Sequence, residues 1–290
     1  MSGRDPAQRP SVLLLHGFLS GSAAWTPLRK LLESEVTVLA PDLLGCGTAR
    51  RGGAPVTIEA IVAHLAPMIA GERFCCVVGH SMGGIIALAL ARQFPAQFGR
   101  VAVVGLPIFD DDAAARSFLS ERGLLHAALL REDRLSHAGC RVLHRLRRWW
   151  LPAAPVVAPR QPRVVIECAF DHSLAGHRDA LRNVIFSGHV GILADQLDVP
   201  VSALHGERDR SAPLARVREL AMRYRWQLQV VAEGTHQLPV EQPELTARWL
   251  YDQIQKSSTR LVGQEIHSAC PAAGGVVRTA GTLFRGGGTA

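Results

Sequence analysis

Phe74-Cys-Cys-Val-Val-Gly-His-Ser81-Met-Gly-Gly-Ile-Ile-Ala-Leu-Ala-Leu-Ala-Arg-Gln93 is the segment from which the fold of this chain can be predicted. Residues 74–78 are a short apolar run, typical of a parallel strand that is covered on both faces. Residues 85–93 are rich enough in Ala and Leu to form a helix. Between them lies a G-x-S-x-G pattern, so the segment predicts a buried strand, a sharp turn with Ser81 at its apex, and a helix.

Ser81 is the candidate nucleophile. Gly79 and Gly83 lack side chains, so the chain can turn tightly enough to hold Ser81 in a strained conformation with its hydroxyl exposed. The N-terminus of the following helix points at the reacting oxygen, where its dipole and the N–H of Met82 would stabilise an oxyanion. An ordinary Gly-rich turn is the alternative interpretation, but the strand before it and the helix after it favour the functional one.

Length and composition indicate one large globular unit. The chain has 290 residues, of which 48% are apolar. No apolar run approaches the roughly 18 residues of a membrane span, and the apolar run near the N-terminus is too short for an export signal. The six cysteines include no C-x-x-C pair, which is typical of reduced thiols. We therefore predict a cytoplasmic protein.

Charge and motif patterns exclude several classes of ligand. The net charge of +7 comes mainly from arginine, without aromatic residues interleaved in a basic stripe, so no nucleic-acid partner is expected. The twelve histidines include no H-E-x-x-H or comparable cluster, so no metal is expected. The glycines of residues 79–84 lack the spacing of a dinucleotide fingerprint, and no cofactor is expected. The sequence does not indicate an oligomeric state.

Strand-like and helical segments alternate along much of the chain. Further strands are predicted at residues 11–15, 36–40, 101–105, 199–204 and 228–231. Helices are predicted between the early strands at residues 25–32 and 57–70, with Thr57 as a half-made N-cap. This alternation predicts a mostly parallel sheet with helices on both faces, built from residues 1–106 and 198–256.

Residues 107–197 interrupt the alternation with Ala-, Leu- and Arg-rich helical character, and we predict that they form an inserted helical cap. Its helices are expected at residues 113–130, 135–150 and 174–197. Four prolines between residues 152 and 162 predict an extended connector. Residues 257–290 lose periodicity and end in a Gly-, Ala- and Thr-rich tract, so a disordered tail is expected.

A basic cluster in the predicted cap has two interpretations. It consists of Arg141, Arg145, Arg147 and Arg148 beside Trp149 and Trp150. Such a face would suit a membrane surface or an anionic substrate. A solvated helix face is the simpler interpretation, and we favour it over membrane contact.

Two further residues complete a candidate catalytic set. A serine hydroxyl needs a base to remove its proton, and an acid must hold that base in the right tautomer. Asp209 follows the strand at 199–204 and His236 follows the strand at 228–231, so both are expected at the carboxyl ends of strands, where open sheets bind ligands. Glu207 and Asp110 are alternative acids from their positions near the same strands.

Five segments together resemble the α/β-hydrolase superfamily, over about residues 10–255. They are His16-Gly-Phe18, Pro41-Asp-Leu-Leu-Gly-Cys-Gly47, Gly79-His-Ser-Met-Gly-Gly84, His205-Gly-Glu-Arg-Asp209 and Gly234-Thr-His236. The order Ser81, Asp209, His236 is also that of the superfamily. The resemblance implies an α/β-hydrolase fold with a helical cap. It also implies an oxyanion hole made by the N–H groups of Phe18 and Met82, orienting roles for His16 and His80, and a structural turn at Pro41-Asp42.

The resemblance implies acyl transfer on a small-molecule substrate. Our leading hypothesis is a serine esterase or lipase-like hydrolase that cleaves a lipophilic carboxylic ester through an acyl-enzyme on Ser81. One alternative is a carbon–carbon bond hydrolase or a lyase similar to the menaquinone-pathway branch, in which cap arginines grip a carboxylate. Candidates for that role are Arg131, Arg134, Arg141 and Arg145, and candidate pocket histidines of the cap are His172, His177 and His189. The other alternative is a non-catalytic ligand-binding module.

Overall fold

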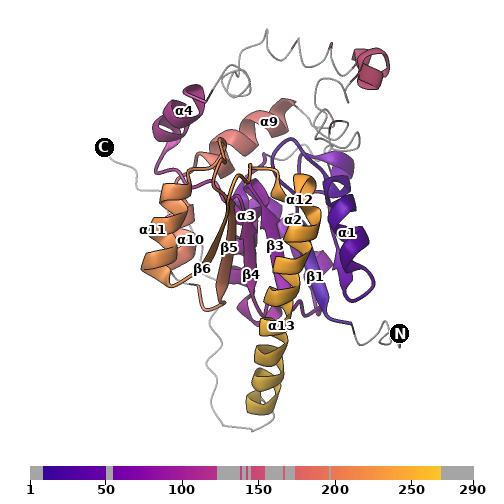
Figure 1. Cartoon of the computed structure of the whole chain (residues 1–290), viewed down its shortest axis with the longest axis vertical. Helices are drawn as coiled ribbons and strands as arrows, with labels where there is room; N and C mark the ends of the chain where they lie inside the picture. The colour runs from indigo at the N-terminus through magenta and orange to yellow at the C-terminus, as the bar shows by residue number, and fades with distance from the viewer. Residues whose placement is uncertain are drawn as a thin grey trace.

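The computed structural model of the chain describes residues 9–49, 55–122, 145–153, 174–195 and 197–268, together with Ala138, Val142 and Ile166. Within these residues, six strands form one sheet in the order β2-β1-β3-β4-β5-β6 (Figure 1). Every neighbouring pair is parallel. This arrangement confirms the predicted parallel sheet.

Helices and strands alternate along the described chain. The strands are β1 (Ser11–Leu15), β2 (Thr37–Leu39), β3 (Cys76–His80), β4 (Val101–Val104), β5 (Val201–Gly206) and β6 (Gln227–Val231). The helices are α1 (Thr26–Leu32), α2 (Ile58–Ile69), α3 (Met82–Gln93), α4 (Asp112–Ser120), α9 (Leu174–Ala180), α10 (Val190–Asp195), α11 (Leu214–Tyr224), α12 (Leu238–Glu241) and α13 (Pro243–Ser268). A π-helical turn at Leu181–Ile185 continues α9.

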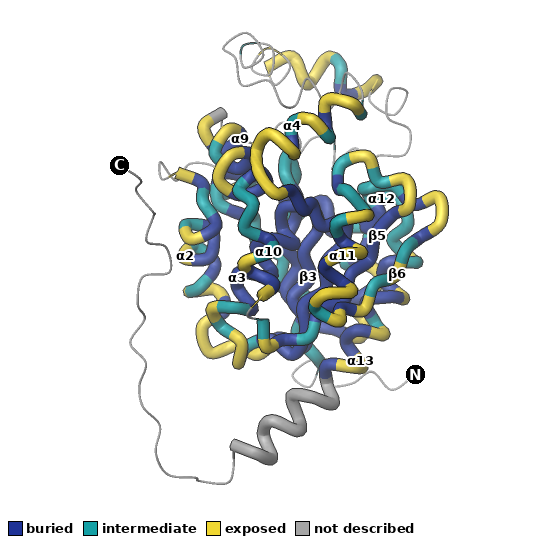
Figure 2. Tube along the Cα trace, turned by 90° about the vertical axis from the view of Figure 1, so that its left-hand side faces the viewer, coloured by how far each residue is buried: buried dark blue, intermediate teal, exposed yellow. Residues whose placement is uncertain are grey.

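The sheet is buried on both faces because successive residues of a strand point to opposite sides. In β1, Leu13 and Leu15 pack into the core under α2, α3, α10 and α11, whereas Val12 and Leu14 pack into a second core under α1 and α13. Figure 2 shows the strands as a dark blue centre with exposed positions outside it. Two cores on one sheet confirm the predicted cover of helices on both faces.

The helix cap at Thr57 and the turn at Pro41-Asp42, both expected from the sequence, are present in the structure. The Thr57 side chain accepts a hydrogen bond from Ala60 N at 3.1 Å and so caps α2, a contact worth about 1 kcal/mol. In the Pro41-Asp42 turn, one Asp42 carboxylate oxygen accepts from Ser22 N at 2.7 Å. The other accepts from the N–H and the hydroxyl of Thr48, at 2.9 and 2.8 Å. The turn is therefore tied to two neighbouring segments.

The central strand and helix lie at different residues from those predicted. β3 runs from Cys76 to His80 instead of over 74–78, because it pairs with β1 and β4 through its last residues. Phe74 forms only an isolated bridge to Phe98, on which its ring stacks at 5.8 Å. α3 begins at Met82, directly after Ser81, so the turn between the two elements is a single residue.

The predicted cap is described in part. α4 begins after Asp111, whose carboxylate accepts from Ala114 N at 2.8 Å, and residues 145–150 are helical. The prediction of one helix over 174–197 is wrong, because the chain leaves its π-helical turn after Ile185 and resumes as α10 at Val190. Gly188 lies in this break with φ +70°, and a Cβ there would overlap the carbonyl oxygen of Asp110. Most of the predicted connector, residues 123–137 and His172 lie outside the described residues.

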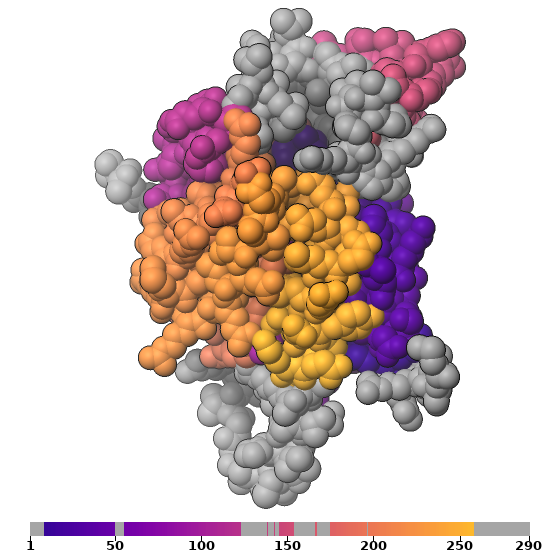
Figure 3. All heavy atoms as spheres, in the orientation of Figure 1, coloured from indigo at the N-terminus to yellow at the C-terminus, as the bar shows by residue number. Residues whose placement is uncertain are grey.

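Two helices cross the boundaries of the segments expected from the sequence or pack across them. α13 extends to Ser268, so a tail starting at residue 257 would begin inside this helix; residues 269–290 lie outside the described residues. α10 packs against α3 at the core, although it belongs to the segment predicted as cap. Figure 3 shows α4 in magenta and the residues of 145–153 in pink at one end of the molecule. Among the described helices, none combines the length and the apolar character that crossing a bilayer requires.

Candidate active site

Ser81 has a strained backbone between β3 and α3. Its φ of +52° is unusual for a residue with a side chain. The turn is held by Ser81 N, which donates to Val104 O at 2.9 Å, and by Gly84 N, which donates to Ser81 O at 2.8 Å. A Cβ at Gly79 would overlap the carbonyl of Gly83, and a Cβ at Gly83 would overlap that of Leu15. Both glycines of the motif are therefore required by close backbone approach.

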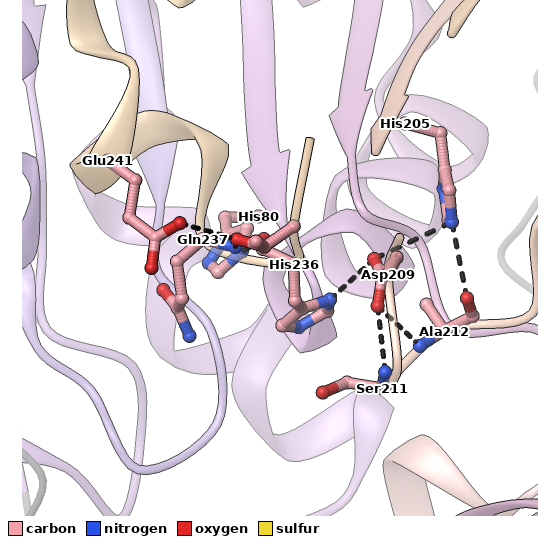
Figure 4. A network of polar contacts seen from close by, with 9 residues as sticks. His80, His205, Asp209, Ser211, Ala212, His236, Gln237 and Glu241 are labelled. Atoms are coloured by element: carbon pink, nitrogen blue, oxygen red, sulfur yellow. Dashed lines mark hydrogen bonds and ion pairs between the residues drawn. The ribbon is translucent and has the colours of Figure 1, made fainter. Parts of the chain in front are cut away.

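Asp209 and His236 are in direct contact. His236 Nδ1 lies 2.8 Å from Asp209 Oδ2, and the Asp209 side chain is completely buried (Figure 4). Its other oxygen accepts from Ser211 N at 2.7 Å and from Ala212 N at 2.9 Å. Burial raises the pKa of Asp209, but the neighbouring histidine and these donors outweigh it, so the pKa lies below its ordinary value. The carboxylate is therefore ionised and directs the Nδ1–H of His236.

The loops after β5 and β6 interlock, which brings these two residues together. Glu207 N donates to Val231 O at 3.0 Å, and Arg208 N donates to Gly234 O at 2.8 Å. The Arg208 side chain forms an ion pair with Glu233 across the same two loops. A Cβ at Gly206 would overlap the carbonyl oxygen of Gly234, so the backbones approach each other closely there.

Two buried histidines hold the neighbouring backbone. His80 Nε2 lies 2.8 Å from the carbonyl oxygen of His236, which can only accept, so this nitrogen carries the proton. Burial and the nearby His236 lower the pKa of His80 to about 3, and it is neutral. His16 Nε2 accepts from Leu43 N at 2.9 Å, so its Nδ1 carries the proton and donates to Gly17 O at 2.9 Å. Each histidine therefore orients one loop of the site.

The segment carrying Phe18 lies against the nucleophile turn. A Cβ at Gly17 would be only 3.2 Å from Ser81 Cβ, so the residues after β1 approach Ser81 closely. Met82 follows Ser81 as the first residue of α3 and is fully buried. The Phe18 ring meets the His177 ring edge-on, with 4.9 Å between centroids.

The alternative acids lie elsewhere. Asp110 forms an ion pair with Arg216 of α11. Glu207 accepts a long hydrogen bond from Glu233 N at 3.4 Å. Of the three acids considered from the sequence, Asp209 is the one in contact with His236.

Two residues near this pair were not singled out from the sequence. His205 is fully buried, with Nε2 at 3.5 Å from Asp209 Oδ2 and at 3.2 Å from Ala212 O. Gly105 follows β4 with φ +58°, and a Cβ there would lie 3.1 Å from His236 Nδ1 and 3.3 Å from Asp209 Oδ2. A histidine four residues before the acid, and a glycine at the end of a central strand, are the signals that could have indicated them.

Ser81 and His236 line one cavity of about 590 Å³, together with Phe18. Most of its wall is apolar, and α4 and the π-helical turn contribute to it from the cap. Apolar lining residues include Trp25, Leu119, Leu181, Ile185, Phe186 and Val240. The charged residues of the lining are Arg208, Arg210 and Glu241. The cavity therefore joins the Ser81 turn to an apolar chamber under the cap.

The polar cap residues predicted for this cavity are not among its described lining. His177 is buried behind Phe18, while His189 and the exposed Arg145 do not line the cavity. Arg131, Arg134 and Arg141 lie outside the described residues. In the described ranges, no three His, Cys, Asp or Glu side chains are grouped so that they could hold a metal ion.

Comparisons with known proteins place this geometry in a family. The sequence profile of the alpha/beta hydrolase family matches residues 12–249. The putative carbamate hydrolase RutD of Escherichia coli is 27% identical over 249 residues, which are 82% of this chain and 84% of that protein. The pimeloyl-[acyl-carrier protein] methyl ester esterase of Aromatoleum aromaticum is 37% identical over 98 residues, which are 33% of this chain and 37% of that protein.

Other matches are more partial or more distant. The chain spans 28% of the length of mycobacterial proteins that are 35% identical to it over 98 residues. The solved structure of E-2-(acetamidomethylene)succinate hydrolase shares the fold, with a TM-score of 0.67 at 19% identity, over 86% of this chain and 92% of that one. The match over residues 12–249 and the parallel sheet lead to one conclusion: the chain belongs to the alpha/beta hydrolase family.

Proposed function

We propose that the protein is a serine hydrolase that cleaves a lipophilic carboxylic ester through an acyl-enzyme on Ser81. The observation that carries this proposal is the 2.8 Å contact between His236 Nδ1 and Asp209 Oδ2, beside a cavity that Ser81 also lines. The name of the partial relative from Aromatoleum aromaticum, a methyl ester esterase, supports the same reaction class.

The geometry suggests the role of each group. Asp209 holds the proton on His236 Nδ1, which leaves Nε2 free to take the proton of the Ser81 hydroxyl. The Ser81 oxygen then adds to the ester carbonyl, and the N–H groups of Phe18 and Met82 stabilise the oxyanion by about 3 kcal/mol each. Collapse of this intermediate breaks the bond to the alcohol, which takes the proton from His236.

Water completes the reaction. His236 removes a proton from the water as it adds to the acyl-enzyme, and the second tetrahedral intermediate expels the Ser81 oxygen, which takes the proton back. The carboxylic acid leaves and the enzyme returns to its starting state. Because His80 donates to the carbonyl of His236 and is itself neutral, it holds the base in place without competing for the proton.

The cavity supports a lipophilic substrate of small to medium size. Its volume of about 590 Å³ is typical of small-molecule sites, and side chains such as Leu181 and Phe186 give it an apolar wall. An acyl chain would therefore lie under the cap while its carbonyl carbon approaches Ser81.

The second candidate uses the same three residues on a carboxylate-bearing substrate, in carbon–carbon bond hydrolysis or a lyase reaction. Its specific support is that two arginines, Arg208 and Arg210, line the cavity. The structural neighbour at 19% identity hydrolyses a succinate derivative, which points the same way. Membership of the alpha/beta hydrolase family opposes the third interpretation, a non-catalytic binding module.

The test is the kinetics of Ser81→Ala on p-nitrophenyl butyrate. We expect a loss on the order of a millionfold in kcat, down to the background of the uncatalysed reaction. Ser34→Ala, which changes an exposed serine after α1, is the matched control and should keep the native rate. A fluorophosphonate probe should label the native enzyme and the control but not Ser81→Ala.

Two outcomes would oppose the proposal. Native turnover by Ser81→Ala would remove the nucleophile from the mechanism. If the native enzyme cleaved carboxylate-bearing diketones but no ester, the second candidate function would be favoured, with the same three residues as its catalytic groups.

A further inference from the structure

We propose that Arg210 is an anion-binding subsite of the cavity, so that the preferred ester carries a second, negatively charged group such as a carboxylate. This inference rests on the proposed function and specifies its substrate class. Arg210 lines the same cavity as Ser81 and His236. It directly follows Asp209 in the loop after β5, so its backbone position is fixed by the same interlocked loops.

The two arginines of the cavity differ in their partners. Arg208 forms an ion pair with Glu233, and 65% of its side chain is exposed. Arg210 is also exposed, but it has no ion pair with any residue in the described part of the chain. Within the described ranges, its positive charge therefore has no acidic partner.

The two acids nearest to Arg210 in the sequence or in the cavity lining, Asp209 and Glu241, accept hydrogen bonds from other groups. Asp209 is next in sequence, but one oxygen accepts from Ser211 N and Ala212 N, and the other contacts His236. Glu241 also lines the cavity and accepts from the Thr235 hydroxyl at 2.6 Å. Both carboxylates therefore accept hydrogen bonds from donors other than Arg210.

Two buried histidines of the lining, His16 and His80, are neutral. Burial lowers the pKa of His16, and burial with the charge of His236 lowers the pKa of His80 to about 3. Among the described lining residues, Arg210 is thus a cation without an acidic partner, beside mostly apolar side chains. A guanidinium in this position can bind a carboxylate through two parallel hydrogen bonds, which a neutral ester cannot accept.

The apolar side chains that line the cavity would strengthen such a pair. A charge-assisted hydrogen bond beside an apolar wall is worth more than one at an open surface, because the surrounding dielectric is lower. We expect a carboxylate placed at Arg210 to improve kcat/KM about tenfold over the methyl group that it replaces. The effect should decrease with ionic strength, since Arg210 is exposed on one side.

The experiment compares Arg210→Gln with the native enzyme on matched ester pairs. One pair places the anion on the acyl side: mono(p-nitrophenyl) adipate against p-nitrophenyl hexanoate. The other places it on the alcohol side: O-pentanoyl glycolate against ethyl pentanoate, followed by pH-stat. For each pair, kcat/KM for the anionic ester is divided by kcat/KM for the neutral ester. The double ratio is this quotient in the native enzyme divided by the same quotient in the variant. It cancels differences in the intrinsic reactivity of the esters.

We expect this double ratio to be about ten for at least one pair and to fall as salt rises from about 0.05 M to about 0.5 M. Arg218→Gln is the matched control: it removes the same charge from the exposed face of α11, away from the cavity lining, and should give a double ratio near one. Arg210→Lys should retain part of the preference, because the charge remains but the planar fork is lost.

The outcomes separate this inference from the proposed function. A double ratio near one for both pairs, with neutral esters still cleaved, would overturn the anionic subsite and leave the serine esterase intact. Equal losses in Arg210→Gln and Arg218→Gln would also overturn it, because the effect would then come from net charge alone. If the native enzyme cleaves neither ester of either pair, the proposed function itself fails.

Discussion

Replacing Gly105 by alanine should damage catalysis more than folding, and the structure provides its own control. Gly105 has φ +58°, and an added Cβ would lie 3.1 Å from His236 Nδ1 and 3.3 Å from Asp209 Oδ2. Gly71, at the end of α2, has φ +77° and nothing within 4 Å of the same added atom. The two variants share the backbone penalty, and only Gly105→Ala adds a contact with the Asp209–His236 pair.

The stability effect can be estimated from the backbone conformation. A residue with a side chain in the left-handed region costs about 1 to 2 kcal/mol relative to glycine. Gly71→Ala should therefore lower the free energy of unfolding by about this amount. Gly105→Ala should lose slightly more, because its methyl group requires neighbours to move by a few tenths of an ångström.

The catalytic effect follows from the position of the imidazole. A displacement of about 1 Å in a catalytic group can cost about a hundredfold, so a shift of a few tenths should reduce kcat about tenfold. Gly71→Ala should keep native kcat. Urea denaturation and p-nitrophenyl butyrate kinetics on both variants measure the two effects separately. Native kcat in Gly105→Ala, with the stability loss of Gly71→Ala, would refute the assignment of His236 as the base.

Two further substitutions test the supporting loops. Asp42→Asn should lower stability by about 1 kcal/mol at neutral pH, after allowance for solvent exposure. Burial raises the pKa of Asp42, but the hydrogen bonds from Ser22 and Thr48 outweigh it and hold the pKa at about 2. The native advantage is therefore complete above about pH 4 and should vanish as the pH falls toward 2 in urea titrations. Gly206→Ala forces its methyl group against the Gly234 carbonyl, so thermal denaturation should show a loss of about 2 kcal/mol, together with reduced ester turnover; unchanged melting would contradict the close approach of these loops.

Much of the sheet could be predicted because its strands are short apolar runs bounded by turn residues. The central segment shows the limit of this approach. Gly79 and His80 look like turn residues, yet both belong to β3, because Gly79 pairs with both β1 and β4 and His80 pairs with β4. Strand pairing is a tertiary property, and local composition does not contain it.

The break between the π-helical turn and α10 has a similar origin. Periodicity in residues 174–197 suits a single helix, but Gly188 packs against the backbone of Asp110, far away in the sequence. The Ser187-Gly188 pair was the available local signal, and it was too weak to locate the break.

The parts of the candidate site that depend on strand order could be predicted from the sequence. The parts that depend on the direction of a side chain could not. β5 and β6 are neighbours, so residues after them, Asp209 and His236, come together. The prediction that cap arginines would reach the substrate has no support among the described lining, where Arg208 and Arg210 approach the cavity from the β5 loop instead. Which way an arginine turns after a strand ends depends on packing that the sequence pattern does not express.

The position of α10 has a consequence for how this enzyme can diversify. The chain leaves β4 at Val104 and must return to the amino-terminal end of the neighbouring parallel strand, β5, before Val201. α10, packed on α3, is the element that makes this return. Substitutions or insertions between Pro107 and Phe186 would alter the side chains that line the cavity above Ser81. The pairing of β4 with β5 would stay in register. A chimera that takes the segment over Ser81 from another hydrolase should therefore keep α10 and be joined ahead of Val190.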